Sequence, residues 1–267
     1  MIAMNSLEKP KISVVTVSYN AEQEIESTML SVINQTYPNL EYIIIDGGSK
    51  DRTIDIINKY KDRITYMVSE PDKGIYDAMN KGIKAATGDW ILFMNAGDSF
   101  YSNDVLDTFV PQIEDDTVIA YGNMMVLLDK YKYKFINNKH DLRNLKSLSM
   151  LPHQATFTKL AYHKQHPFDI SFICAADYNF FYKAYFNDKC KFQYVPVIVA
   201  NFDGVSGVSS TQGKYALKEY PIIQGRTSFW YSKVYLVFKT LVKSIMTPEM
   251  RYKRLRQQGY ILEKRED

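Results

Sequence analysis

The first hundred residues alternate between short runs of β-branched apolar residues and longer segments whose apolar positions recur every three or four residues. The apolar runs are short and rich in Val and Ile, and they predict strands at residues 12–17, 41–45, 64–69 and 90–94. The segments with helical spacing lie between those runs, at residues 22–35, 53–60 and 76–86. This alternation predicts an α/β fold with a mostly parallel central sheet, and right-handed crossovers place helices on both faces of the sheet.

The second half of the chain has a less regular pattern. Residues 118–128 predict a strand or one arm of a hairpin, and residues 153–158 and 192–199 predict further strands. Residues 176–185 predict a helix rich in aromatic side chains. Because no linker or repeat interrupts this region, we expect one domain over residues 10–226, with halves at about 10–100 and 101–226.

A basic segment follows that domain and forms a second unit, residues 227–267. A helical wheel over residues 229–246 gathers Trp230, Phe238 and other apolar residues on one side, which predicts an amphipathic helical tail. Arg251, Lys253, Arg254 and Arg256 follow. Such a helix can lie on an anionic membrane surface, or it can pack against its own domain or a partner subunit. Both interpretations remain open at this stage.

Charge and composition narrow the classes of protein. Residues 229–267 carry a net charge of +5, whereas residues 1–228 carry −2, so the whole chain has only +3 and is not expected to bind nucleic acid. Hydrophobic residues make up 46% of the 267 residues, which excludes disorder as the main state. Two cysteines exclude a disulfide framework and a four-cysteine zinc site.

The pattern of apolar residues also bears on location. No apolar run reaches the roughly 18 residues that a membrane-spanning helix needs, and residues 1–11 lack the apolar core of a secretory signal. We therefore expect a cytoplasmic protein. If the tail binds lipid, the expected place is peripheral, on the inner face of the cytoplasmic membrane.

Polar residues follow each of the first four predicted strands. Ser18, Tyr19 and Asn20 follow the first strand, and Asp46 follows the second with two glycines after it. The third and fourth strands are followed by segments 70–74 and 95–98, which carry further amides and carboxylates. Ligands bind beyond the carboxyl ends of parallel strands, so these side chains are expected at one binding site. Asp and Gly are also ordinary loop formers, and only their joint placement favours a site.

Four segments carry a resemblance to a known family: ISVVTVSYN at 12–20, IIIDGGSKDRT at 43–53, SEPDKGIYDAMNKG at 69–82 and ATGDWILFMNAGD at 86–98. In order and spacing they resemble the nucleotide-sugar-binding half of the family 2 glycosyltransferases, which have the GT-A fold. The later segments PHQATF at 152–157, FDISFICAADYNFF at 168–181 and FDGVSGVS at 202–209 resemble the acceptor half of the same family.

The resemblance implies a metal-dependent inverting glycosyltransferase. Its expected donor is a nucleotide sugar, with UDP as the expected nucleotide, and its acceptor is a saccharide or a polyprenyl-linked glycan in cell-surface polysaccharide biosynthesis. Whether the chain forms a homo-oligomer is left open. One alternative is a non-catalytic nucleotide-sugar-binding or scaffold protein. A sugar nucleotidyltransferase is disfavoured, because residues 17–20 lack the glycine-rich, basic loop that such an enzyme carries there.

The resemblance also transfers roles to individual residues of the donor site. Asp46 is expected on the nucleobase or ribose, Asp72 near the ribose and phosphate, and Lys73 near the diphosphate. The ordinary alternative for Asp72 and Lys73 is a solvated turn. The full set expected to bind the nucleotide sugar is Thr16, Ser18, Tyr19, Asn20, Asp46, Asp72, Lys73, Asn95, Ala96 and Gly97.

Asp98 marks a departure from the family pattern. The family commonly has an Asp-x-Asp element that binds Mn²⁺ or Mg²⁺, whereas Asn95-Ala96-Gly97-Asp98 keeps only the last carboxylate. One carboxylate is enough for a hard cation that also takes phosphate oxygens and waters, so Asp98 is expected to bind the metal.

The acceptor half supplies the expected catalytic residue. The resemblance implies that Asp177 is the general base, although an Asp at the start of a helix is also a common N-cap. His153 and Gln154 are expected to contact the acceptor or the donor; the alternative is a structural role.

Overall fold

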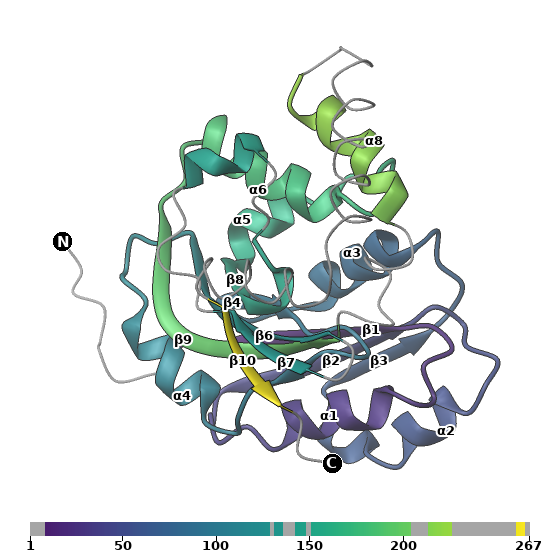
Figure 1. Ribbon diagram of the computed structural model, residues 1–267. Helices are drawn as coiled ribbons and strands as arrows, with labels where there is room; N and C mark the ends of the chain where they lie inside the picture. The colour runs from purple at the N-terminus through teal and green to yellow at the C-terminus, as the bar shows by residue number, and fades with distance from the viewer. Residues whose placement is uncertain are drawn as a thin grey trace.

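Ten strands of one mixed sheet organise the protein, in a computed structural model that describes residues 9–128, 131–135, 142–147, 151–203, 213–225 and 260–264 (Figure 1). Along its main path the strand order is β10-β7-β6-β8-β4-β1-β2-β3, with β9 beside β6 and β5 beside β9. The α/β fold with a mostly parallel core is therefore confirmed.

The first half of the chain builds the parallel core of the sheet. β1 (Ile12–Ser18) pairs in parallel with β2 (Leu40–Asp46) on one side and with β4 (Trp90–Phe93) on the other. β2 pairs in parallel with β3 (Tyr66–Ser69). The chain thus moves outward from β1 to β3 and then returns to the other side of β1. This reversal of direction opens a crevice at the carboxyl ends of β1 and β4.

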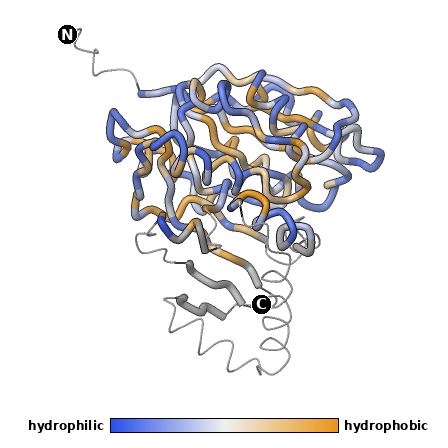
Figure 2. The backbone as a smooth tube through the Cα atoms, turned by 90° about the horizontal axis from the view of Figure 1, so that it is seen from above, coloured by the Kyte–Doolittle hydropathy of each residue, from blue (hydrophilic) through white to orange (hydrophobic). Residues whose placement is uncertain are grey.

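Helices cover both faces of that core (Figure 1). α1 (Ile25–Ile33), α2 (Thr53–Asn58) and α4 (Val105–Phe109) lie on one face, while α3 (Ile75–Ala85), α5 (Leu160–Gln165) and α6 (Ala176–Phe186) lie on the other. The sequence periods explain this. Ile12 and Val14 of β1 pack with the first group of helices, and Val15 and Val17 pack with the second. Figure 2 shows the apolar segments running through the middle of the molecule.

The second half extends the sheet with antiparallel strands. β6 (Ile119–Leu128) forms a hairpin with β7 (Tyr131–Phe135), so the expected hairpin arm is confirmed. β8 (Thr156–Lys159) inserts between β4 and β6 and is antiparallel to both. β9 (Phe192–Asp203) runs parallel to β6 and pairs with the short β5 (Ser99–Phe100). α8 (Gly213–Ile223) then packs against α6.

One of the predicted strands begins later in the structure than the sequence indicates. The strand expected at residues 153–158 begins later, because a 3₁₀ turn, His153–Ala155, precedes β8. In this turn Thr156 Oγ1 donates to the carbonyl of Pro152 at 2.7 Å, which removes His153 and Gln154 from the strand ladder. These two residues therefore lie in a local turn, closed by a hydrogen bond between residues four positions apart, and not in the predicted strand.

The predicted helical tail lies mostly outside the described residues, including the wheel at 229–246 and the basic residues at 251–256. Within 227–267 the structure describes β10 (Tyr260–Lys264), which pairs antiparallel with β7 at the edge of the sheet. These five residues form a strand, and the helix predicted at 229–246 stays a prediction. Among the described residues no helix is long and apolar enough to span a membrane.

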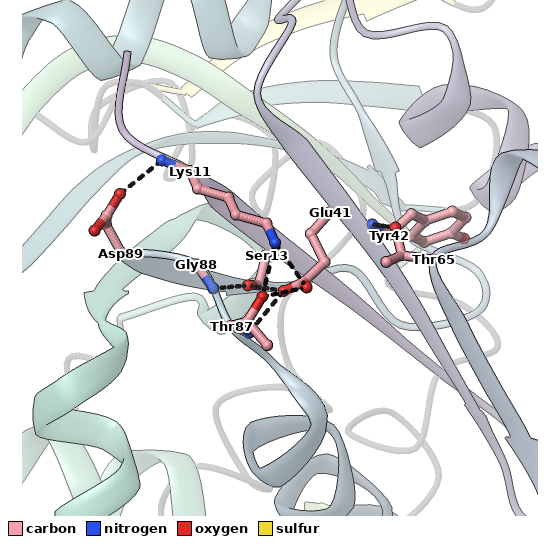
Figure 3. Close-up of polar contacts among 8 residues, drawn as sticks. All are labelled: Lys11, Ser13, Glu41, Tyr42, Thr65, Thr87, Gly88 and Asp89. Atoms are coloured by element: carbon pink, nitrogen blue, oxygen red, sulfur yellow. Dashed lines mark hydrogen bonds and ion pairs between the residues drawn. The ribbon is translucent and has the colours of Figure 1, made fainter. Parts of the chain in front are cut away.

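The buried carboxylate of Glu41 links the amino-terminal ends of the parallel strands through hydrogen bonds (Figure 3). Glu41 is only 4% exposed, and it accepts hydrogen bonds from Ser13 Oγ at 2.5 Å and Lys11 Nζ at 3.1 Å. It also accepts from the backbone N and the Oγ1 of Thr87, at 2.8 and 2.6 Å. Next to Thr87, Gly88 must be glycine, because a Cβ there would lie 2.6 Å from the carbonyl oxygen of Lys11. The cluster therefore joins β1, β2 and the turn before β4.

This cluster gives the stability of the fold a dependence on pH. Burial raises the pKa of Glu41, but the hydrogen bonds from Ser13, Thr87 and Lys11 outweigh it and bring the pKa down to about 2. The carboxylate pKa is thus lower in the folded chain than its ordinary 4.5. Its contribution to stability is complete above about pH 4.5 and is lost as the pH falls towards 2.

We predict that Glu41→Gln lowers the free energy of unfolding at pH 7 by about 1.5–3 kcal/mol, because a charged acceptor of several hydrogen bonds is lost. Urea denaturation at pH 7 and at pH 3 measures this free energy. The difference in unfolding free energy between the variant and the unmodified chain should be smaller at pH 3. The control is Glu114→Gln, whose side chain is 60% exposed in a surface ion pair with Lys191. Equal unfolding midpoints for the two variants would contradict the structural role of Glu41.

Candidate active site

A pocket of about 550 Å³ opens at the carboxyl ends of β1 and β4. This size lies within the range of about 300–1,000 Å³ that is usual for small-molecule sites. Three polar segments line it: Ser18–Asn20 after β1, Asp72–Asp77 around the start of α3, and Asn95–Asp98 after β4. The crevice created by the strand order is therefore also where the polar loops meet.

The loop after β1 has an unusual backbone. Asn20 has a φ of +48°, a left-handed conformation that Asn tolerates better than most residues. Its Oδ1 accepts from the backbone N of Lys50 at 2.8 Å, and its own N donates to Ser49 Oγ at 2.8 Å. These bonds fix the turn, and they leave the neighbouring Tyr19 side chain 63% exposed at the mouth of the pocket.

Asp46 lies beneath the pocket and does not line it. Its residue is fully buried, and its carboxylate accepts five hydrogen bonds from Ser18 Oγ, Gly48 N, Ser49 N, Ser49 Oγ and Ser69 Oγ, at 2.5–3.0 Å. Burial raises the pKa of Asp46, but these donors hold it below its usual range. The carboxylate shapes the loops after β1, β2 and β3, and no acceptor position remains for a ligand. Asp46 is not among the described lining residues, and its direct contact with a nucleotide stays a prediction.

The loop before α3 is a tight turn closed by two carboxylates. Asp72 Oδ1 accepts from Gly74 N at 2.8 Å, and Asp77 Oδ2 accepts from Lys73 N at 3.0 Å. Gly74 has a φ of +117°, which a residue with a side chain adopts only under strain. The turn presents Asp72 and Lys73 to the pocket, as the sequence predicted.

The loop after β4 presents Asp98. Gly97 has a φ of +101°, and Thr28 of α1 holds the loop, because its Oγ1 accepts from Gly97 N at 3.0 Å and donates to the carbonyl of Asp98 at 2.7 Å. Gln154 Nε2 lies 3.4 Å from Asp98 Oδ1. Gln154 was expected to contact the acceptor or the donor. In the structure it is buried and does not line the pocket, and its side chain supports Asp98.

Asp177 lies at the first turn of α6 and is 4% exposed. Its Oδ1 accepts from Tyr76 Oη at 2.9 Å and from Tyr178 N at 2.8 Å, and its Oδ2 lies 3.3 Å from His153 Nδ1. Burial and the charge of Asp177 raise the pKa of Tyr76 well above its usual range, so this phenol stays protonated and donates. Tyr76 and His153 line the pocket, whereas Asp177 does not. The N-cap alternative is wrong, because Ala175 is the capping residue.

His153 joins two parts of the site. Its Nδ1 faces Asp177, and its Nε2 lies 3.0 Å from Asn95 Nδ2. Burial lowers the pKa of His153, but the hydrogen bond to Asp177 and the charges of Asp177 and Asp98 raise it more, so the net shift is upward. Asn95 Oδ1 is buried and has no hydrogen-bond partner within the described part of the chain. Within that part, the Asn95 side chain therefore forms its hydrogen bond through Nδ2.

The charge of the pocket bears on the metal that the resemblance implies. Four carboxylate side chains line it, whereas Lys73 is the one Lys or Arg among the described lining residues; the carboxylates are Glu24, Asp72, Asp77 and Asp98. A diphosphate would be repelled by such a lining unless a divalent cation accompanied it. Within the described ranges no three His, Cys, Asp or Glu side chains form a ready cation cage. The residues fit a metal held by one carboxylate and by substrate phosphates.

Ten of the residues expected from the sequence line one pocket: Ser18, Tyr19, Asn20, Asp72, Lys73, Asn95, Ala96, Gly97, Asp98 and His153. Thr16 does not, because it is buried and donates to the carbonyl of Met94 at 2.8 Å. Tyr76 was missed, and so was an apolar wall made by Ile170, Phe172, Ile173 and Phe202. Nothing in their local sequence distinguishes these residues from ordinary core or surface positions.

Comparison with known proteins identifies the family. The model described as Glycosyl transferase family 2 matches residues 13–181. A PGL/p-HBAD biosynthesis glycosyltransferase of Mycobacterium bovis (strain BCG / Pasteur 1173P2) is 28% identical over 221 residues, covering 80% of this chain and 85% of that protein. A glycosyltransferase of Mycobacterium tuberculosis (strain CDC 1551 / Oshkosh) is 32% identical over 209 residues, covering 75% of this chain and 78% of that one.

Solved structures share the fold. TarS 1–349 of S. aureus, in complex with UDP-GlcNAc, superposes with a TM-score of 0.64 at 18% identity, and the match covers 80% of this chain and 64% of TarS 1–349. The mannosyltransferase PcManGT of Pyrobaculum calidifontis, in complex with GDP-Man and Mn²⁺, superposes with a TM-score of 0.63 at 14% identity, covering 95% of this chain and 81% of that one. At these identities the likeness establishes the fold alone.

We predict that Asp46→Asn destabilises the chain by about 1.5–3 kcal/mol, because an amide nitrogen would face donors where a carboxylate now accepts. The loss of protection from hydrogen exchange should be greatest in the loop after β2. Amide hydrogen exchange should accelerate at Gly48 and Ser49, whose N–H groups donate to Asp46 Oδ2. Exchange at β1 amides serves as the internal reference, and unchanged protection at Gly48 and Ser49 would show that the carboxylate does not hold this loop.

Proposed function

The chain belongs to family 2 of the glycosyltransferases, and on that premise we propose that it is an inverting enzyme that transfers a sugar from a UDP-linked donor to a lipid-linked saccharide. The observation that carries this proposal is the convergence of Asp72, Lys73, Asn95 and Asp98 on one pocket, which His153 also lines with Asp177 in contact behind it. A donor-binding region and a proton-accepting region are what such a transfer needs.

The polar half of the pocket supports the donor. We assign the nucleotide to the side formed by Ser18, Tyr19 and Asn20, and the diphosphate to the space between Lys73 and the loop 95–98. Asp46 organises these loops from beneath. UDP is proposed because a structural neighbour, TarS, was solved with UDP and with UDP-GlcNAc.

Asp98 is the proposed metal-binding residue, with Mn²⁺ or Mg²⁺ as the cation. When bound, the cation offsets the charge that develops on the leaving diphosphate. The mannosyltransferase neighbour was solved with Mn²⁺, which supports the same cofactor class here. Because carboxylates outnumber basic side chains in the pocket lining, such a cation would strengthen the binding of a diphosphate.

Asp177 is the proposed catalytic carboxylate. In an inverting transfer the acceptor oxygen attacks the anomeric carbon from the face opposite the leaving group, and one base must take its proton. No second acid is required, because a metal-bound diphosphate is already a good leaving group. Asp177 contacts two residues that line the pocket, Tyr76 at 2.9 Å and His153 at 3.3 Å, and this position supports the role.

The acceptor is proposed to be a saccharide carried on a lipid, as in cell-surface polysaccharide biosynthesis. Ile170 and Ile173 are each 47% exposed, and with Phe172 and Phe202 they give the pocket an apolar wall. Hydroxyl-rich sugars alone do not need such a wall, whereas a lipid or aryl group gains from contact with it.

A non-catalytic nucleotide-sugar-binding protein is the second candidate, because only one carboxylate remains at the metal position. A panel of UDP- and GDP-sugars with Mn²⁺, monitored for nucleotide release with and without acceptor, separates the two. Binding of a donor with no release of nucleotide under any condition would favour the non-catalytic candidate.

We predict that Asp98→Asn lowers metal-dependent nucleotide release and UDP affinity in Mn²⁺ by on the order of 100-fold, because the cation loses its protein carboxylate. UDP affinity in EDTA should stay within about twofold of the unmodified chain. Calorimetry with UDP, in Mn²⁺ and in EDTA, measures both. Asp62→Asn, an exposed carboxylate outside the pocket, is the control. Near-normal turnover of Asp98→Asn would place the metal elsewhere.

The basic cluster of the tail, Arg251, Lys253, Arg254 and Arg256, is proposed to hold the enzyme on the cytoplasmic face of an anionic membrane. Each basic residue near such a surface contributes roughly 1 kcal/mol, and the attraction weakens with salt. This would bring the pocket to an acceptor that stays in the membrane.

Replacing all four residues of the basic cluster by Glu should abolish co-sedimentation with vesicles that contain phosphatidylserine, while UDP binding persists. The matched control replaces four exposed lysines of the domain by Glu: Lys59, Lys61, Lys84 and Lys164. Vesicle binding that is insensitive both to the cluster variant and to 0.5 M salt (about a threefold higher ionic strength than physiological) would rule out this electrostatic attachment.

A further inference from the structure

A loop before α6, residues 170–174, gives the pocket most of its apolar wall. Ile170, Phe172 and Ile173 line the pocket, and the two isoleucines are each 47% exposed. Large apolar side chains left open to water gain little from burial, so this loop needs contacts through its backbone to keep its shape. The loop leads directly into α6, whose first turn carries Asp177.

The start of this loop is tied to α3 and to a turn of its own. Asn80 of α3 makes two hydrogen bonds with the backbone of Phe168, since its Nδ2 donates to the carbonyl and its Oδ1 accepts from the N, each at 2.9 Å. Asp169 Oδ1 then accepts from the N and the Oγ of Ser171, at 3.0 and 2.6 Å. These contacts fix the first part of the loop but not its end.

Glu219 of α8 holds the end of the loop. Its Oε1 accepts from Ile173 N at 2.6 Å, its Oε2 accepts from Cys174 N at 3.1 Å, and the residue is 8% exposed. A carboxylate that accepts from two successive backbone N–H groups fixes the orientation of both residues. The backbone of Ile173 is therefore held from outside the pocket, while its side chain lines the pocket.

The helix that carries Glu219 is itself fixed on α6. The rings of Tyr220 and Tyr178 meet edge to face with their centroids 4.8 Å apart, and Gln224, directly after α8, donates from Nε2 to Tyr178 Oη at 2.7 Å. Tyr178 is 1% exposed and follows Asp177 in the first turn of α6. The helix that holds the apolar wall therefore also packs against the turn that carries the proposed base.

Resting on the proposed transfer to a lipid-linked saccharide, we propose that Glu219 is a positioning residue for the acceptor. It holds residues 170–174 so that Ile170 and Ile173 stay open to the pocket, where they bind the alkyl part of the acceptor. The loop after β4, which carries the proposed metal-binding residue, is held separately by Thr28 of α1. Loss of the Glu219 carboxylate is therefore expected to weaken acceptor binding and to leave nucleotide binding unchanged.

Glu219 does not act on the substrate itself. It is not among the described residues that line the pocket, and each of its oxygens accepts from a backbone N–H group. Asp177, in contrast, contacts two side chains that do line the pocket, those of Tyr76 and His153. The proton-accepting role therefore stays with Asp177, and Glu219 acts through the loop that it holds.

The test compares octyl β-glucoside with methyl β-glucoside, which share a sugar and differ in the alkyl chain. Calorimetry with the full-length chain in Mn²⁺ and UDP measures Kd for each, with the octyl compound kept below its micelle concentration. The unmodified chain should bind the octyl compound more tightly. In Glu219→Gln this preference should fall about tenfold, because the amide presents an N–H donor to one backbone N–H group and the loop spends less time in its binding conformation. Kd for UDP should stay within about twofold.

A double-mutant cycle with Ile173→Ser separates positioning from general damage. Ile173→Ser alone should weaken binding of octyl β-glucoside about fivefold, because apolar contact is lost. If Glu219 acts through this side chain, Glu219→Gln should reduce the affinity by a smaller factor in the Ile173→Ser background than in the unmodified chain. Equal factors in the two backgrounds would show that Glu219 does not act through the wall.

The matched control is Lys218→Gln, at an exposed position next to Glu219 on α8, which should leave both Kd values unchanged. Glu219→Asp keeps a carboxylate on a shorter side chain and should lose part of the octyl preference, so the test stands even if Glu219→Gln does not fold. An octyl preference that is unchanged in the Glu219 variants, or absent from the unmodified chain, would overturn the proposal. A chain that shows the expected preference but releases no UDP from any donor would refute the proposed transfer instead.

Discussion

The parallel pairing of β1 with both β2 and β4 is the constraint on which the site depends. Because the chain leaves β1 in one direction and returns on its other side, the loops after β1 and β4 emerge next to each other with nothing between them. Ala96 N donates a hydrogen bond to the carbonyl of Val17 at 3.1 Å, so the pairing of β1 with β4 continues into the loop that lines the pocket. Packing on both faces then fixes this edge, since β1 is buried along its whole length.

Two buried carboxylates hold opposite ends of the same strand. Glu41 at the start of β2 and Asp46 at its end are each surrounded by hydroxyl and backbone donors, and both have lowered pKa values. Burial of a charge is unfavourable, and only a full set of hydrogen bonds offsets it. One cluster ties the strands to the turn before β4, and the other shapes the loops of the pocket. The edge of the sheet that carries the pocket is therefore held from beneath by Asp46, which does not line the pocket.

Around His153, the contacts come from both halves of the domain. Asp177, His153 and Asn95 come from α6, from the turn before β8 and from the loop after β4, and they form one chain of polar contacts. Such a chain links the acceptor half of the domain to the donor half. Asp98 follows Asn95 by three positions, and Gln154, which contacts Asp98, follows His153, so two short segments make both sets of contacts.

The amino-acid sequence by itself determined the α/β class, the parallel strands of the first half and the polar loops at their carboxyl ends, because hydrophobic period and loop chemistry are local properties. The resemblance of their segments to the family led us to expect Asp98 and His153 at the site, and both line the pocket. Only the tertiary structure decided which carboxylates face the pocket: Asp46 and Asp177 look like ligand contacts in sequence, yet donors from distant strands and helices surround them. Tyr76 and the wall of Ile170 and Ile173 entered the site through packing alone. Burial depends on which segments meet in space, and one segment's sequence does not encode its neighbours.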